Sequence, residues 1–164
     1  MADKSYHVLF VCTGNSARSI LAEGLLNALG RGSFVGHSAG SHPKEQPHPL
    51  ALQTLAAHGI PSDGYRSKSW DEFAQSAAPA LDFVFTVCDQ AAGETCPYWP
   101  GQPMTAHWGL PDPAAVQGSE AEREKAFVDT FVALKRRIEL MLALPMKSLD
   151  GLALRRELEA IGRR

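Results

Sequence analysis

A cysteine and an arginine six positions apart, with small polar residues between them, form the most chemically capable segment of the chain. The segment reads Cys12-Thr13-Gly14-Asn15-Ser16-Ala17-Arg18-Ser19 and joins an apolar run to a helical pattern. Successive backbone N–H groups in such a loop can form an anion-binding nest, and an arginine can close a fork on a tetrahedral oxyanion. The positive potential at a helix N-terminus favours the thiolate of Cys12, and Ser19 can donate to it. The segment therefore predicts nucleophilic attack on a bound oxyanion.

Two further thiols and a carboxyl group extend this chemistry. Cys88 ends an apolar run, Cys96 follows eight residues later, and Asp112 stands between two prolines that restrict the backbone. The extra thiols suggest a redox step, and Asp112 suggests a general acid. Each residue also has a plainer interpretation: a buried structural cysteine for Cys12 and Cys88, a surface cysteine for Cys96, and a turn aspartate for Asp112.

The composition limits the class of protein. The chain has 164 residues, 45% of them hydrophobic and 21% charged, which fits one ordinary globular domain. A formal net charge of -2 argues against a protein that coats nucleic acid, and every apolar run is too short to span a membrane. The histidines show no metal-ligand spacing with the cysteines, so we expect no metal site. Three cysteines, an odd number, without an export signal predict a reducing, cytoplasmic setting.

Alternating strands and helices are expected to position these residues. Apolar, β-rich runs predict strands at residues 6–11, 34–38, 81–87 and 104–108. Helical patterns cover residues 21–29, 49–59, 119–145 and 148–161, and capping boxes are expected at residues 69–72 and 119–122. The alternation predicts an α/β fold: a single three-layer domain over residues 5–145, with a central four-stranded parallel sheet flanked by helices. Residues 146–164 are expected to form a C-terminal helical extension.

A parallel sheet brings the carboxyl ends of its strands to one edge. Cys12, Ser38, Cys88 and Asp112 each end or follow one of the predicted strands. In open parallel sheets, ligands bind beyond the carboxyl ends of the strands. The predicted fold therefore gathers four chemically capable residues at one candidate site.

Several segments resemble a known family. Residues 8–24 resemble the phosphate-binding loop of low-molecular-weight protein tyrosine phosphatases, and more closely that of the arsenate reductases built on the same fold. Residues 37–41 are similar to the family's second strand and the turn after it. Residues 86–89 and 96–97 resemble the reductases' second and third cysteine segments, and residues 107–114 resemble the segment with the general acid. The matches run in order from residue 8 to about residue 143.

The resemblance implies reduction of arsenate through a thiol cascade. Cys12 would attack arsenate, Arg18 and the loop amides would bind its oxygens, and Asp112 would protonate the departing oxygen. Cys88 would then attack Cys12 and release arsenite, and Cys96 would resolve that disulfide by pairing with Cys88. The implied enzyme binds no cofactor and takes electrons from thioredoxin or a related thiol system. Weak phosphatase activity would be a side reaction.

The implied Cys88–Cys96 disulfide has a geometric consequence. A disulfide needs Cα atoms about 4.4–6.8 Å apart, whereas eight helical residues span about 12 Å. A helical segment there would have to unwind or fold back on oxidation, so we expect it to be mobile.

Two departures from the family pattern stand out. Ala17 replaces a cysteine found in many members, so no thiol pair can form within the loop. In some reductases a cation site uses Asn, Glu, Ser and Asp. Asn15, Glu23 and Ser38 match three of these positions, and Lys68 stands at the fourth, where its ammonium could replace the metal ion.

Two other functions remain open at this point. The first is a low-molecular-weight protein tyrosine phosphatase that hydrolyses phosphotyrosine through a Cys12 phosphoenzyme. Phosphatases usually place aromatic residues after the Asp-Pro pair, where this chain has Ala114 and Ala115, although Tyr98 and Trp99 could serve instead. The second is a non-enzymatic, oxyanion-binding redox sensor, in which Asp112 would have no role.

Overall fold

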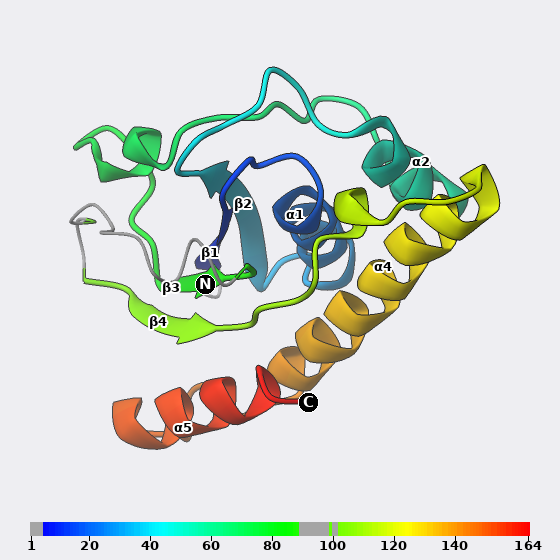
Figure 1. Ribbon diagram of the computed structural model, residues 1–164. Helices are drawn as coiled ribbons and strands as arrows, with labels where there is room; N and C mark the ends of the chain where they lie inside the picture. The colour runs from blue at the N-terminus through cyan, green and yellow to red at the C-terminus, as the bar shows by residue number, and fades with distance from the viewer. Residues whose placement is uncertain (1–4, 89–98, 100–101) are drawn as a thin grey trace.

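Four parallel strands form the centre of the protein in the order β2-β1-β3-β4 (Figure 1). The computed structural model describes residues 5–88, 99 and 102–164. The strands are β1 (Tyr6–Cys12), β2 (Phe34–Gly40), β3 (Phe83–Thr86) and β4 (Met104–His107). The predicted parallel sheet is therefore confirmed, with β3 and β4 shorter than expected and β1 and β2 longer. β3 begins only at Phe83 because the carboxylate of Asp82 accepts a hydrogen bond from the N–H of His7, 2.8 Å away.

The sheet is buried on both faces, as parallel sheets require. The side chains of residues 8–11 in β1 are all inaccessible to solvent, which explains their uninterrupted apolar run. Adjacent residues of β2 show what covers each face, because successive side chains on a strand point to opposite sides. Ser38 bonds Glu23 of helix α1, whereas the ring of His37 packs against Phe73 of a 3-10 helix.

Helices cover the sheet in the three-layer arrangement that the sequence predicts. Helix α1 (Arg18–Leu29) packs against β2, α2 (Pro49–Ala57) and α4 (Glu120–Leu142), and α5 (Gly151–Ile161) packs against β4 and α4 (Figure 1). The 3-10 helix η1 (Trp70–Ala74) lies against β2, and η2 (Pro113–Ala115) follows β4 near α4. In the described part of the chain, no helix is long and apolar enough to cross a membrane.

The two predicted capping boxes have different outcomes. At α4, the hydroxyl of Ser119 accepts from the N–H of Glu122, whose carboxylate bonds the N–H of Ser119, so this box is confirmed. At η1, Ser69 accepts from the N–H of Asp71, and the carboxylate of Glu72 pairs with Arg66. The capping box predicted at residues 69–72 is therefore wrong, because the carboxylate of Glu72 pairs with Arg66 instead of the N–H of Ser69. The short helix is a 3-10 helix.

Helix α5 contributes to the same core as the sheet. Leu154, Leu158 and Ile161 lie on its buried face, as the helical spacing of these residues predicts. Asp150 caps the helix by accepting from the N–H of Ala153 at 2.8 Å.

Candidate active site

The strand register brings the candidate residues to one edge of the sheet. Cys12 pairs with Gly40 across β1 and β2, Val11 pairs with Thr86, and Thr86 pairs with His107. Cys88 and the segment that carries Asp112 continue from the last two strands at this edge. Ser38 lies nearby, but its hydroxyl donates to Glu23 of α1.

The loop after Cys12 turns its carbonyl groups away from the site. The carbonyl oxygens of Thr13, Gly14 and Ser16 each accept a backbone hydrogen bond at 2.9 Å from the segment of residues 42–48. The carbonyl of Asn15 accepts from the hydroxyl of Ser67 at 2.6 Å. Because these oxygens accept hydrogen bonds from segments outside the loop, the N–H groups of the loop can face the cavity and form an anion-binding nest.

The loop fits only because residue 40 has no side chain. A Cβ at Gly40 would lie 2.4 Å from the carbonyl oxygen of Thr13 and 2.9 Å from the nitrogen of Asn15. Asn15 itself has a φ of 47°, in the left-handed region that asparagine tolerates better than most residues. The tight turn of the loop thus depends on both residue types.

Helix α1 begins at this loop without a side-chain cap. Its N-cap is Ala17, which has no hydrogen-bonding side chain, and the first turn has no acidic residue. The first N–H groups of the helix and the positive end of its dipole are therefore available to an anion. The Nε of Arg18 is also buried without a hydrogen-bond partner within the described residues, so it can donate to the same anion.

A chain of hydrogen bonds directs a donor at the sulfur of Cys12. The N–H of Lys68 donates to Oδ1 of Asn15 at 2.9 Å, which orients the amide. Nδ2 of Asn15 then donates to Oγ of Ser19 at 2.9 Å, and this hydroxyl lies 2.9 Å from Sγ of Cys12. Because Ser19 accepts from Asn15, its own proton can point to the sulfur, where it stabilises a thiolate.

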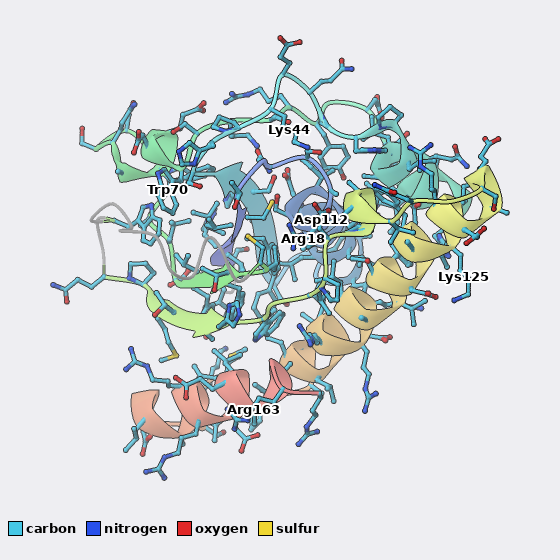
Figure 2. All side chains as sticks on the ribbon, viewed as in Figure 1. Arg18, Lys44, Trp70, Asp112, Lys125 and Arg163 are labelled. Carbon is cyan, nitrogen blue, oxygen red and sulfur yellow. The ribbon has the colours of Figure 1, made fainter. Side chains whose placement is uncertain are left out.

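Arg18 faces Asp112 across the mouth of the site. Nη2 of Arg18 lies 3.9 Å from a carboxylate oxygen of Asp112, and Nη1 donates to the carbonyl of Leu110 at 2.8 Å. The carboxylate of Asp112 also accepts from the N–H of Ala114 at 3.0 Å and so caps η2. Figure 2 shows Arg18 and Asp112 next to each other, with Lys44 on a neighbouring loop.

The second thiol lies at the edge of the loop. Cys88 is buried, and its sulfur is 3.5 Å from the hydroxyl of Thr13, the residue that follows Cys12. Neither Cys12 nor Cys88 forms a disulfide. Cys96, and with it the segment expected to rearrange on oxidation, lies outside the described residues.

The residues for which the resemblance implied a cation site lie together. Nζ of Lys68 donates to the carbonyl of Ser38 at 2.9 Å, and the Ser38 hydroxyl donates to Glu23. Burial raises the pKa of Glu23, an effect opposed by the bond from Ser38 and by the charge of Lys68. Burial lowers the pKa of Lys68, and the charge of Glu23 opposes this change. Among the described residues, here and elsewhere, no group of three or more His, Cys, Asp or Glu side chains could hold a metal ion.

A small cavity of about 220 Å³ occupies the centre of this arrangement. Loop residues 12–14 and 16–18 line it together with His42, Lys44, Asp112 and Ala114. The sequence interpretation missed His42 and Lys44. Their place depends on the backbone bonds of their loop to Thr13 and Gly14, which no local sequence pattern reveals. The stem of Lys44 packs so closely over Gly14 that a Cβ there would lie 3.3 Å from it.

Aromatic side chains are absent from the described wall of this cavity. None of its lining residues is Phe, Tyr or Trp. Trp99 is buried edge-on against Trp70, with ring centroids 6.3 Å apart, and lines a different cavity beside β4. Tyr98, the other candidate for an aromatic wall, lies outside the described residues.

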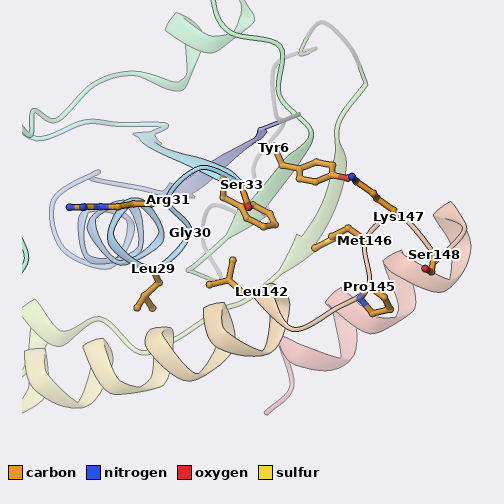
Figure 3. Close-up of a pocket in the computed structure, with 11 residues that line it drawn as sticks. Tyr6, Leu29, Gly30, Arg31, Ser33, Leu142, Pro145, Met146, Lys147 and Ser148 are labelled. Carbon is orange, nitrogen blue, oxygen red and sulfur yellow. The ribbon is translucent and has the colours of Figure 1, made fainter. Parts of the chain in front are cut away.

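A larger cavity of about 480 Å³ lies at the opposite end of the sheet (Figure 3). Tyr6 and Phe34, which begin β1 and β2, line it together with Leu142 and Met146. Its described lining contains no cysteine, histidine or carboxylate. The smaller cavity is therefore the better candidate for chemistry.

Comparisons with known proteins identify similar chains. Residues 7–151 match the family described as low molecular weight phosphotyrosine protein phosphatase. An arsenate reductase of Halalkalibacterium halodurans is 34% identical over 120 residues, which cover 73% of this chain and 83% of that protein. An arsenate reductase of Bacillus subtilis is 34% identical over 116 residues, covering 71% of this chain and 80% of that protein.

Solved structures show the same similarity. An arsenate reductase in the phosphate binding state has a TM-score of 0.68 and 29% identity, covering 84% of this chain and 97% of that one. A thioredoxin-dependent arsenate reductase of Corynebacterium glutamicum has a TM-score of 0.56 and 26% identity, covering 85% and 65%. A low molecular weight protein tyrosine phosphatase from T. tengcongensis has a TM-score of 0.63 and 25% identity, covering 82% and 96%.

Proposed function

The chain belongs to the low molecular weight phosphotyrosine protein phosphatase family, and within that family we propose that it reduces arsenate to arsenite. The observation that carries the proposal is the second buried thiol, Cys88, in contact with Thr13 beside the nucleophile. Phosphate-ester hydrolysis needs one thiol and a water molecule, whereas reduction of arsenate needs a second thiol close to the first. The arsenate reductases among its relatives support the same assignment.

The first step forms a bond between sulfur and arsenic. The thiolate of Cys12 attacks arsenate, whose oxygens are bound by the loop amides and Arg18. One oxygen of arsenate leaves as water after protonation. In this proposal the proton comes from Asp112, which lines the cavity. Ser19 stabilises the thiolate before the attack through its 2.9 Å contact.

The second step transfers the electrons. The sulfur of Cys88 attacks the sulfur of Cys12, so that an S–S bond forms and the S–As bond breaks. The electron pair of that bond goes to arsenic, which leaves as arsenite. Two thiols are thus oxidised to one disulfide for each arsenate reduced. Cys96 then attacks Cys88, which frees Cys12 and leaves a Cys88–Cys96 disulfide.

We assign the regeneration of these thiols to thioredoxin. A chain that supplies its own second and third thiols needs a dithiol reductant that accepts a protein disulfide. A structural relative, the reductase of Corynebacterium glutamicum, is thioredoxin-dependent. Because the thiols must be kept reduced, the chemistry belongs in a reducing compartment such as the cytoplasm.

The main alternative is hydrolysis of phosphotyrosine. The absence of Phe, Tyr and Trp from the described cavity wall disfavours it, because a phenyl ring would find only Ala114 after the Asp-Pro pair. The non-enzymatic alternative is disfavoured by Asp112, which faces Arg18 in the cavity where a binding module would have no use for an acid.

Arsenate turnover in thiol variants tests the proposal. With arsenate, thioredoxin, thioredoxin reductase and NADPH, the wild type should oxidise NADPH, and Cys12→Ser, Cys88→Ser and Cys96→Ser should not. Without reductant, Cys96→Ser should still release one arsenite per chain, because its first two thiols are intact, whereas Cys88→Ser should release none. A parallel reaction with glutaredoxin and glutathione tests the electron donor.

Phosphotyrosine and p-nitrophenyl phosphate serve as competing substrates. Efficient hydrolysis that is lost only in Cys12→Ser, with no arsenate turnover, would establish the phosphatase instead. Phosphate binding without either activity would establish the binding module.

A further inference from the structure

We propose that helix α5 and the buried Arg137 of α4 clamp the segment of residues 108–112, so that Arg137 is a positioning residue for Asp112. The proposal rests on the proposed function, because it concerns the acid of the same site. Family similarity covers residues 7–151, whereas α5 extends from Gly151 to Ile161. The helix therefore lies almost entirely outside the matched region, and yet it contacts the segment that carries Asp112.

The guanidinium of Arg137 forms one side of the clamp. Its Nη1 donates to the carbonyl oxygens of Trp108 at 2.7 Å and Gly109 at 3.3 Å. Its Nε donates to the main-chain oxygen of Arg164 at 3.2 Å, which joins the segment to the residues after α5. Only 6% of the Arg137 surface is exposed, and burial lowers the pKa of the guanidinium. Burial of a cation is costly unless hydrogen bonds replace its lost hydration, and the three carbonyl oxygens of Trp108, Gly109 and Arg164 do so here.

The ring of Trp108 forms the other side. Trp108 is fully buried and stacks on Phe85, with ring centroids 4.0 Å apart. Its Nε1 donates to the carbonyl of Leu158 in α5 at 2.9 Å. A Cβ at Gly162 would lie 2.2 Å from the carbonyl oxygen of His107 and 2.8 Å from Cδ1 of Trp108, so the backbone after α5 touches this segment directly.

The clamped segment leads straight to the reacting groups. The carbonyl of Leu110 accepts from Arg18, and Asp112 follows two residues later between prolines that fix the backbone. A displacement at residues 108–109 is therefore transmitted to Leu110 and Asp112 instead of being absorbed by a flexible hinge. General acids act only when they are within hydrogen-bond reach of the proton acceptor, so such a displacement reduces proton transfer.

Matched arginine variants test the clamp. Arg137→Gln removes the fork of bonds to the segment, and Arg136→Gln on the exposed side of α4 is its control. We expect Arg137→Gln to lower kcat for arsenate about tenfold, with KM changed less than about threefold, because the anion-binding loop is intact. Arg137→Lys, which keeps the positive charge and a single donor nitrogen, should recover part of the loss, and Arg136→Gln should match the wild type.

A double-mutant cycle separates positioning from general damage. Asp112→Asn should lower kcat and abolish one limb of its pH profile. Adding Arg137→Gln to that variant should lower kcat less than about twofold further, since both changes act through the same acid. If Arg137→Gln lowers kcat by the same factor in the wild type and in Asp112→Asn, the role of Arg137 is merely structural and the proposal is overturned.

Amide hydrogen exchange provides a readout that does not depend on arsenate. In Arg137→Gln, the N–H groups of Leu110 and Ala114 should exchange faster than in the wild type. There, Leu110 donates to the carbonyl of Val87 and Ala114 donates to the carboxylate of Asp112. If the wild type fails to reduce arsenate but this exchange increases, the proposed function fails and the clamp stands. If the wild type reduces arsenate, but Arg137→Gln leaves hydrogen exchange unchanged and its effect on kcat adds to that of Asp112→Asn, the clamp is refuted and the proposed function stands.

A second pair of variants covers the case in which Arg137→Gln does not fold. Trp108→Phe removes the bond to Leu158 but keeps an aromatic ring on Phe85, and it should give the same kcat loss and exchange pattern. Gly162→Ala forces a Cβ against His107, whereas Gly151→Ala at the other end of α5 enters open space and is its control. If Trp108→Phe and Gly162→Ala both keep the kcat and the amide exchange rates of the wild type, the clamp is refuted.

Discussion

At the scale of single residues, the side-chain amide of Asn15 determines the direction of hydrogen bonding at the nucleophile. Its oxygen is committed to the N–H of Lys68, so its nitrogen must donate to Ser19. Ser19 is thereby left with its proton for the sulfur of Cys12. The network is buried, and the low dielectric there strengthens each bond and makes an unpaired group costly.

The Ser19→Ala variant should make Cys12 a weaker nucleophile. Removing the hydroxyl takes away the donor 2.9 Å from the sulfur, so the attacking thiolate loses a stabilising hydrogen bond. We expect the rate of Cys12 alkylation by iodoacetamide at pH 7 to fall about tenfold, the equivalent of ~1.4 kcal/mol, within the range for bonds to charged groups. Ser33→Ala, at an exposed position far from the loop, is the control. An unchanged alkylation rate would show that Ser19 does not support the thiolate.

At the scale of elements, the pairing of β1 and β2 carries a titratable contact. Nδ1 of His7 and Nε2 of His37 lie 2.9 Å apart, on the face of the sheet opposite α1. Burial, then the charges of His7 and Lys68, lower the pKa of His37 from 6.5 to about 4. The folded protein therefore keeps this ring neutral under conditions that protonate it in the unfolded chain.

This contact predicts a loss of stability in mild acid. Between pH 6.5 and about 4 the unfolded chain binds a proton at His37 and the folded chain does not, so the unfolding free energy falls as the pH falls. His37→Gln should flatten that dependence by about 1–2 kcal/mol, less than the full shift because solvent partly screens the ring. Urea denaturation at pH 7 and pH 4.5 measures it, and the exposed His58, changed to Gln, is the control. The same slope in wild type and His37→Gln would contradict this origin.

The elements could be predicted from the sequence to the extent that local patterns define them. The uninterrupted apolar run of β1 and the leucine spacing of α1 both correspond to the structure. The start of β3 could not be predicted, because it depends on a bond between Asp82 and His7, far apart in the chain. The pairing of loop 42–48 with the carbonyls after Cys12 is equally non-local. Arg137 falls on a helix whose other charges face solvent, and only tertiary packing shows that it is buried.

At the scale of the whole molecule, one core includes both the sheet and the C-terminal helix. Leu158 is fully buried in that core, and its carbonyl accepts a hydrogen bond from Nε1 of Trp108. The site at the sheet edge and the helix after residue 150 are therefore parts of one packed unit.

Leu158→Ala should destabilise the entire protein. Truncation of a fully buried leucine leaves a cavity and costs about 2–5 kcal/mol, and the loss should appear in a single unfolding transition that includes the sheet. Leu152→Ala, at a side chain that is 61% exposed, should change the unfolding free energy by less than about 0.5 kcal/mol. Circular dichroism and tryptophan fluorescence during urea denaturation would test this. A separate early transition would show that α5 unfolds independently.

The order of the site residues along the chain has a consequence for biosynthesis. Cys12 is synthesised before its partners, because Asp112, Arg137 and Gly162 follow 100 to 150 positions later. At about 5–20 residues per second, the ribosome needs about 5–30 s to reach these partners. The nascent chain thus carries its reactive thiol before the fold can bury it. During translation, only the redox state of the surrounding compartment protects Cys12 from oxidation.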